Sequence, residues 1–579
     1  MSSSDPRAAT SALADAPNVA ARHPQFAQAL RLQAGGDPAA ARQLYLGLIE
    51  TPALTAACLH QLAVITSLRN EHERAAGLFR HALKLDPSNL RNYSSLANAL
   101  SRCGNGAAAL GVLLDQGCAL QNAGRYADAE IPYREILSHD LLNYGAYVNL
   151  GTCLAQLHRL PEALQQLFRA MQLYGRLDKR VADFALALRE RLADNIDVPL
   201  EAVLPPGLPN GRIEKIEDAI TTLGKIMSEF CRPQEAVLCH RQSIALAPGF
   251  ALAHWNLSLA LLATGSHAEG WQEYEWRWHW EGFPGAQRRL PIQPWRGEPL
   301  SGQRVLVWAE QGFGDTLQFA PLVSRLAQMG AQVTFEVMTP LVRLLAQSFT
   351  DITVIEGPAQ NQPALQGRDF DFGIANLSLP ARLGLSAKSL PLATGYLKAA
   401  PDDIARWAPR LASNGRLRVG VVWAGRSKPD ARRSIAFELM APLFDRRVIK
   451  WYSLQVGPEQ DDIPKGGNAA IDSLAAELTD FAETAAAMTH LDLIITIDTA
   501  AAHLAAALGK PVWLLLPRVS DWRWVETTAV SSWYPSLRIF RQASDGHWGS
   551  VIAAVGEALD CRTAQPVAAA DSAQVSLWT

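Results

Sequence analysis

A spacing of thirty-four residues recurs through the first half of the chain and constrains its fold more than any other feature. It separates pairs of small or apolar residues such as Leu62 and Leu96, Ala75 and Ala109, Gly117 and Gly151, and Ala129 and Ala163. A period of this length indicates repeated helix pairs, because one pair cannot bury its apolar face alone and must stack on its neighbours. We therefore expect an α-helical superhelix over residues 23–284.

The repeating unit is clearest over residues 147–170, where large and small side chains alternate. Gly151 and Ala163 let two helices approach, while Leu154 and Leu167 fill the space between them. This pattern resembles the tetratricopeptide repeat, and roughly six copies fit before residue 280, with a break at 177–212. The resemblance implies a superhelix whose concave face holds a peptide or a protein.

The sixth position of each copy is polar. The residues there are Gln61, Ser95, Asp115, Asn149, Thr222 and Asn256. If they line the concave face, they can hydrogen-bond an extended peptide backbone without reading its sequence; a solvated face explains them equally well. We name Asn149 and Asn256 as candidate acceptor-binding residues.

Four tryptophans close the repeat array, at positions 271, 276, 278 and 280. So many large aromatic side chains are unusual on a free surface, and we expect them to pack the last repeat against the following domain. Stacking on a sugar is the alternative. The proline-containing segment 285–302 is expected to be a linker.

Beyond the linker, short apolar strands alternate with amphipathic helices. This order predicts two Rossmann-like α/β halves, 303–414 and 415–560, that face a cleft. The polar, alanine-rich ends of the chain, 1–22 and 561–579, are expected to be disordered.

The stretch Leu493–Val512 predicts a β-α-β unit in the second half. Leu493–Ile497 is a continuous apolar run typical of a buried parallel strand, and Asp498 and Thr499 follow it before a small-residue helix. The helix N-terminus offers N–H groups and a positive dipole end to phosphate. An ordinary, well-capped crossover is the alternative.

Gly312, Gly314 and Asp315 follow the first predicted strand of the first half. Glycine permits close backbone approach, so Asp315 can face the cleft while it starts a helix; it can also serve only as the helix cap. The third glycine of a dinucleotide fingerprint is absent, which disfavours NAD binding.

The densest positive charge of the α/β region lies in the segment 423–435, which holds Arg426, Lys428, Arg432 and Arg433. Near the helix N-terminus at Thr499 these side chains would form a diphosphate site. A solvated basic loop is the alternative.

Two motifs carry a family resemblance. Gly314–Pro321 is similar to the G-D-x-x-x-x-x-P pattern of the bacterial ADP-heptose heptosyltransferases, and Asp498–Leu504 is similar to their D-T-G-x-x-H-L motif. The resemblance covers nearly half the chain and implies a GT-B fold. The chain departs from the motifs at Ala500, where the family has glycine, and at Gln318, where it has histidine.

The resemblance also implies roles for individual residues. Asp315 takes the position of the catalytic base. The nucleotide-sugar site would be formed by Gly312, Gly314, Gln318, Arg426, Arg433, Ser434, Asp498, Thr499, Ala500, Ala501 and His503. No D-x-D acid pair lies in a suitable loop, so we expect no metal ion and no cofactor besides the nucleotide-sugar substrate.

Repeats placed before a GT-B domain also resemble the architecture of protein O-linked N-acetylglucosamine transferases. The combined interpretation is an inverting, metal-independent glycosyltransferase that acts on a protein held by the repeats. Two alternatives stay open: a heptosyltransferase-like enzyme with a lipopolysaccharide or other glycan acceptor, and a non-catalytic repeat adaptor.

The charge balance and the cysteines agree with this class of protein. A formal net charge of −3 argues against nucleic-acid binding, and the seven cysteines form no C-x-x-C pair. The sequence has no apolar stretch long enough to span a bilayer. We expect a cytoplasmic protein.

Overall fold

The computed structural model describes most of the chain. The described residues are 23–193, 196, 204–210, 215–283, 290–357, 370–412, 415–426, 430–463, 471–524, 529–544 and 546–564. They form two compact units, one made of residues 1–227 and 238–248 and the other of residues 228–237 and 249–579. The predicted disordered N-terminus lies outside the described residues.

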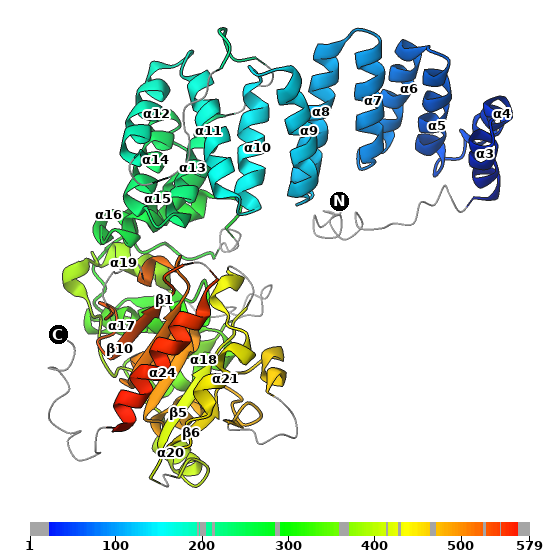
Figure 1. Ribbon diagram of the computed structural model, residues 1–579. Helices are drawn as coiled ribbons and strands as arrows, with labels where there is room; N and C mark the ends of the chain where they lie inside the picture. Colours follow the sequence, from blue (N-terminus) through cyan, green and yellow to red (C-terminus); the bar gives the residue numbers. More distant parts are fainter. Residues whose placement is uncertain are drawn as a thin grey trace. The chain divides into compact units, whose positions relative to one another are not determined.

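The first unit is built from antiparallel helix pairs that follow one another in chain order (Figure 1). Its helices, the last two of which also contribute to the second unit, are α3 (Pro24–Ala34), α4 (Pro38–Leu48), α5 (Thr55–Leu68), α6 (His72–Leu85), α7 (Leu90–Arg102), α8 (Gly106–Asn122), α9 (Tyr126–His139), α10 (Tyr144–Gln156), α11 (Leu160–Tyr174), α12 (Lys179–Leu192), α13 (Ile216–Glu229) and α14 (Pro233–Leu246).

Small residues at the recurring positions let paired helices touch. A Cβ atom added to Gly117 would lie 2.4 Å from the Tyr133 ring, and one added to Gly151 would lie 2.8 Å from Leu167. Such contacts leave no room for a larger side chain, which explains why glycine recurs with the period of the repeat. The predicted repeat fold is confirmed, and α12 supplies a helix within the predicted break.

The second unit begins with the last helices before the sheets. These are α15 (Ala251–Ala263), α16 (His267–Tyr274) and the 3₁₀ segment η1 (Glu275–His279). Trp271 is 1% exposed and lies edge-on to Phe319 of the first α/β half and to Trp522 of the second. The prediction that this segment packs against the following domain is therefore confirmed for Trp271.

All strands of the second unit pair in parallel, in two sheets. The first sheet has the order β3-β2-β1-β4 and the second the order β10-β9-β8-β5-β6-β7. The strands are β1 (Arg304–Trp308), β2 (Gln332–Val337), β3 (Thr353–Glu356), β4 (Phe372–Ala375), β5 (Leu417–Val422), β6 (Ile449–Ser453), β7 (Ile471–Ser473), β8 (Leu493–Ile497), β9 (Val512–Leu516) and β10 (Leu537–Arg541). The predicted pair of parallel α/β halves is confirmed.

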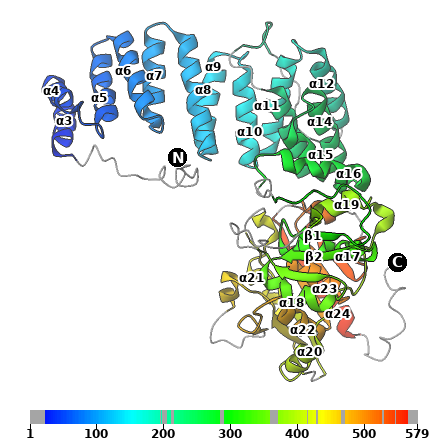
Figure 2. The same ribbon diagram turned by 180° about the vertical axis from the view of Figure 1, so that it is seen from behind.

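Helices cover the sheets on both faces (Figures 1 and 2). Side chains of β8 alternate between the two faces: Ile494 lies in the core with α22 and α23, and Ile495 in the core with α21 and α24. The main helices are α17 (Phe313–Gln328), α18 (Thr339–Ser348), α19 (Leu379–Arg382), α20 (Pro401–Trp407), α21 (Phe437–Phe444), α22 (Phe481–Thr489), α23 (Ala500–Ala507) and α24 (Trp548–Ala564).

Short 3₁₀ segments complete the unit. They are η3 (Asn376–Ser378), η4 (Ala387–Ser389), η5 (Ala431–Arg433), η6 (Pro458–Asp462) and η7 (Trp522–Trp524).

Two segments predicted to be irregular are partly ordered. The buried Trp295 of the predicted linker donates its backbone N–H to the Gly373 carbonyl at 3.0 Å, so the linker pairs alongside β4. Helix α24 continues to Ala564, and within its last turn the Thr563 hydroxyl donates to the Leu559 carbonyl at 3.0 Å. The remaining tail, 565–579, lies outside the described residues, and the predicted domain bounds stay predictions.

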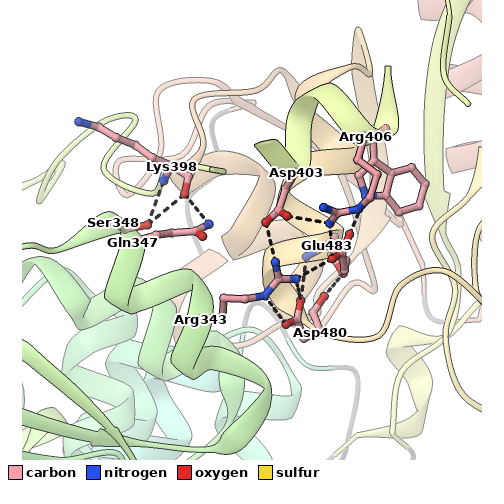
Figure 3. A network of polar contacts seen from close by, with 10 residues as sticks. Arg343, Gln347, Ser348, Lys398, Asp403, Arg406, Asp480 and Glu483 are labelled. Carbon is pink, nitrogen blue, oxygen red and sulfur yellow. Dashed lines mark hydrogen bonds and ion pairs between the residues drawn. The ribbon is translucent and has the colours of Figure 1, made fainter. Parts of the chain in front are cut away.

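A cluster of ion pairs joins α18 of the first half to α20 and α22 (Figure 3). Arg343 donates to Asp403 at 2.6 Å, to both oxygens of Asp480 at 2.8 Å, and to Glu483 at 2.7 Å. Arg406 donates to Asp403 and Glu483 at 2.7 and 2.6 Å. Partial burial raises the pKa values of Asp480 and Glu483, but the arginine hydrogen bonds outweigh it and lower both.

We predict that Arg343→Met lowers the stability of this unit at neutral pH by on the order of 1 kcal/mol. The carboxyl pKa values lie lower in the folded chain, so the contribution is complete above their unfolded-state pKa of about 4 and is lost as the pH falls through the folded values. Urea unfolding at pH 7 and pH 3 measures this, and the loss of unfolding free energy caused by the substitution should be smaller at pH 3 than at pH 7. A difference of equal size at both pH values would contradict the prediction.

Candidate active site

The strand orders locate one crevice at the carboxyl end of each sheet. The chain direction across the first sheet reverses between β1 and β4, and across the second between β5 and β8. Ligands bind outside the carboxyl ends of parallel strands at such reversals. The glycine loop 310–315 follows β1, the segment 423–426 follows β5, and Asp498 and Thr499 follow β8, so all three predicted motifs lie at these ends.

The first motif forms the start of α17. Gly312 is the N-cap, and the Asp315 carboxylate accepts the Gly312 backbone N–H at 3.0 Å, so Asp315 does cap its helix. Its side chain is 20% exposed, and its second oxygen accepts an ion-pair hydrogen bond from Arg523. Capping therefore uses only one of the two carboxylate oxygens.

Gly314 brings the two halves together. A Cβ atom at this position would lie 2.8 Å from the His503 ring and 3.7 Å from the Ala500 Cα. Any larger residue would push α17 away from α23. The two motifs predicted from distant parts of the sequence are thus in direct contact.

His503 lies buried in this contact as a neutral side chain. Burial, with a smaller effect of Arg523, lowers its pKa to about 3. Its Nδ1 is 3.0 Å from the Tyr534 hydroxyl, and its ring packs on Trp524 and Tyr534.

The N-terminus of α23 points into the same region. Its N-cap, Thr499, makes no side-chain hydrogen bond to the helix, so it leaves the first-turn N–H groups of Ala500 and Ala501 uncapped by a side chain. Burial raises the pKa of the preceding Asp498 to about 6, and the neighbouring Asp521 carboxylate adds to this rise.

Arg433 lies against this strand end. Its guanidinium donates to the Asp498 carbonyl at 3.0 Å and to the Arg426 carbonyl at 3.1 Å, while its buried Nε has no partner among the described residues. The Ser434 hydroxyl accepts the Gly425 N–H at 3.1 Å. The Arg426 side chain is exposed, and Lys428 lies outside the described residues.

Arg523 is the site residue that the sequence interpretation missed. It follows β9 on η7 and donates to Gln318 at 2.6 Å and to Asp521 at 2.8 Å, in addition to Asp315. Its guanidinium carbon lies 4.2 Å from the centre of the Trp522 ring. In the sequence, Arg523 follows β9, the strand next to β8, in a polar segment. That position was the signal that could have identified it, but no motif singles out this segment.

Glu310 and Arg277 form a second pair that was not predicted. Arg277 is fully buried and donates from Nε and one terminal nitrogen to the two oxygens of Glu310, at 2.9 and 3.1 Å. Burial raises the pKa of Glu310 to about 7, although Arg277 opposes the rise. The neighbouring Gln311 donates to the Tyr274 hydroxyl at 2.8 Å. The glycine loop is therefore anchored on η1 and the end of α16.

The candidate acceptor residues lie in different compact units. Asn149 on α10 is half-buried and its amide nitrogen lies 3.7 Å from the Cys118 sulfur. Asn256 on α15 is buried, and its Nδ2 has no partner among the described residues. The structure also describes no cluster of three or more metal-ligating side chains within those residues.

Two parallel-sheet halves that meet at their motif-bearing ends define the GT-B class of fold. Within it, residues 460–516 match the family described as glycosyltransferase family 9 (heptosyltransferase). The matched segment contains β8, α23 and β9, and so the motif Asp498–Leu504.

Other similar proteins cover parts of the chain. Protein FlbA of Caulobacter vibrioides is 28% identical over 357 residues, which are 56% of this chain and 58% of that protein. The chain thus spans less than two thirds of this relative. E. coli ADP-heptose LPS heptosyltransferase II has 16% identity and a TM-score of 0.35, and the match covers 45% of this chain and 99% of that one. The TPR protein YrrB has 18% identity and a TM-score of 0.19, with 36% and 95% covered.

The chain thus combines helical repeats with a C-terminal α/β region in which residues 460–516 are similar to the heptosyltransferase family, in agreement with the resemblance seen in the motif Asp498–Leu504. Within the described parts of the chain, no helix combines the length and the apolarity that crossing a membrane requires.

We predict that Arg277→Met destabilises the second unit by about 3–5 kcal/mol, because Glu310 stays buried without its partner. The double variant Arg277→Met/Glu310→Leu should recover most of this loss. Chemical unfolding measures both. Arg304→Met is the matched control: its pair with Asp371 is exposed, so about 1 kcal/mol or less is expected. Equal losses of unfolding free energy in the Arg277 and Arg304 variants would contradict the conclusion that Arg277 stabilises this unit through its buried pair with Glu310.

Proposed function

We propose that this protein is a glycosyltransferase that moves a sugar from a nucleotide-diphospho-sugar to an acceptor hydroxyl, with inversion and without a metal ion. The observation that carries the proposal is the contact between the two motifs: Gly314 of the first half touches His503 of the second. This contact brings a carboxylate, Asp315, close to the α23 N-terminus. A base and an anion site in one crevice are what such a transfer requires.

The proposed donor site uses helix dipole and arginine charge. The diphosphate would lie at the N–H groups of Thr499, Ala500 and Ala501, with Arg433 beside them. Gly312 and Gly314 would allow close approach of the sugar, and Ser434, Arg426 and Asp498 would border the nucleotide. The family description, heptosyltransferase, favours a heptose or a related sugar.

The proposed acceptor is a protein segment bound by the repeats. Tetratricopeptide-like helices present long polar faces, and the unpartnered amide of Asn256 and the half-buried Asn149 can each hydrogen-bond a peptide backbone. A lipopolysaccharide or another glycan is the competing acceptor, and a non-catalytic adaptor is the competing class.

Asp315→Asn tests the catalytic assignment. The amide keeps the shape of the side chain but cannot accept the acceptor's proton, so transfer should fall by about a hundredfold or more. Incubation with radiolabelled sugar nucleotides measures transfer, and calorimetry verifies that the variant still binds the nucleoside diphosphate. Transfer at the wild-type rate would leave Asp315 with a capping role only.

Arg433→Ala tests the anion site. Affinity for the nucleoside diphosphate should fall about tenfold, because a charged hydrogen-bond donor is lost. Arg432→Ala is the matched control from the same loop, since Arg432 pairs with Asp430 and Glu229, and it should change affinity less than about threefold. Equal effects of the two substitutions would remove Arg433 from the site.

The acceptor is tested by replacing Asn149 and Asn256 together with alanine. Labelling of lysate protein should fall by about thirtyfold, at roughly 1 kcal/mol for each of the two lost amide contacts, while hydrolysis of the donor is retained. Asn98→Ala, at an exposed position of α7, is the control. Unchanged protein labelling would argue against a role of these two residues, and label found in the lipopolysaccharide fraction instead would favour the glycan acceptor.

A further inference from the structure

Arg523 occupies a central position between the two α/β halves. It comes from η7 of the second half, and its Nε and one terminal nitrogen donate to Gln318 and Asp315 on α17 of the first half. The other terminal nitrogen donates to Asp521 at 2.8 Å. The side chain is only 9% exposed, so these contacts hold the guanidinium in a fixed orientation.

The contacts leave donors unused. A guanidinium has five N–H groups, and the contacts among the described residues engage three of those on Arg523. The Nε2 amide of the buried Gln318 also has no partner among these residues. Buried donors without acceptors are unfavourable, and a ligand with several oxygen atoms would satisfy them.

The surroundings identify the chemical class of this ligand. Arg523 is close enough to Asp498 and His503, which frame the first turn of α23, to influence their pKa values. That turn presents backbone N–H groups. A planar guanidinium and a helix N-terminus together suit a phosphate or diphosphate group, which binds both kinds of donor.

We propose that Arg523 is shared between Asp315 and the donor's diphosphate. In the free protein the arginine pairs with Asp315, and the arriving phosphate oxygens take over that side of the guanidinium. The Asp315 carboxylate is thereby released, so the base becomes available only when the donor is bound. This inference rests on the proposed function.

The acceptor oxygen forms a bond to the anomeric carbon of the sugar, and its proton passes to Asp315. The bond between the anomeric carbon and the phosphate oxygen breaks, and its electron pair leaves with the nucleoside diphosphate. Arg523 then stabilises the charge that grows on this leaving group, which makes it a catalytic residue.

A double-mutant cycle on binding tests the sharing. Calorimetric titrations of the full chain would use ADP, UDP and GDP, and the tightest of the three would serve for all variants. Asp315→Asn should tighten binding by about fivefold, since the phosphate no longer competes for the arginine. Arg523→Met should weaken binding by about tenfold or more. In the Arg523→Met background, Asp315→Asn should change affinity less than about twofold.

The cycle separates competition from simple repulsion. If Asp315 only repels the phosphate, its substitution tightens binding by the same factor in both backgrounds, and the inference is wrong. Arg446→Met is the matched control, because this arginine of the same half pairs with Asp560 outside the site. It should leave affinity unchanged.

Two further outcomes would also test whether Arg523 is shared. If Arg523→Met does not fold, Arg523→Lys replaces it; lysine keeps the charge but loses the fork, and should weaken binding relative to the wild-type chain. Asp315→Asn alone still decides, because unchanged or weaker binding overturns the inference. If the wild-type chain binds none of the three diphosphates, the proposed function fails as well. If the wild-type chain binds a diphosphate but the effects of the Asp315 and Arg523 substitutions on affinity are independent, only the sharing of Arg523 is overturned.

Discussion

The structure of the candidate site depends on one buried cation, Arg523, placed where the two sheets meet. Its partners Asp315 and Gln318 belong to one half and Asp521 to its own. A buried charge must be paired, so the position of η7 and the start of α17 depend on each other. The contact of Gly314 with His503 brings the same elements together through packing. Polar and steric constraints therefore join the halves at the same point.

A second buried pair extends this dependence to the end of the repeat array. Arg277 and Glu310 join η1 to the loop that carries Gly312, Gly314 and Asp315, and Trp271 packs between Phe319 and Trp522. Trp271 and Tyr274 are thus part of the core that supports the site. A fragment that begins after the tryptophan-rich segment would leave Glu310 buried without its cation, so the α/β halves need this segment to keep the glycine loop in place.

The sequence predicted those helices and strands that are determined by residues close together in the chain. The apolar run Leu493–Ile497 has the same bounds as β8, and the recurrence of Gly117 and Gly151 reflects contacts within single helix pairs. Arg523 was not predictable in this way, because its partner Asp315 lies about two hundred positions away and no periodic pattern surrounds it. The three-residue strand β7 is too short to show an alternation, and it was missed for that reason.

A crystal structure of the full chain with a bound nucleoside diphosphate tests the central claim most directly. The account predicts the diphosphate at the first turn of α23, within hydrogen-bonding distance of Arg523 and Arg433, with the Asp315 carboxylate no longer paired to Arg523. A diphosphate bound elsewhere, such as the hollow of about 450 Å³ near Arg304 and Thr353 at the opposite ends of the first sheet's strands, would contradict it. So would a diphosphate at α23 that leaves the pair between Asp315 and Arg523 unchanged.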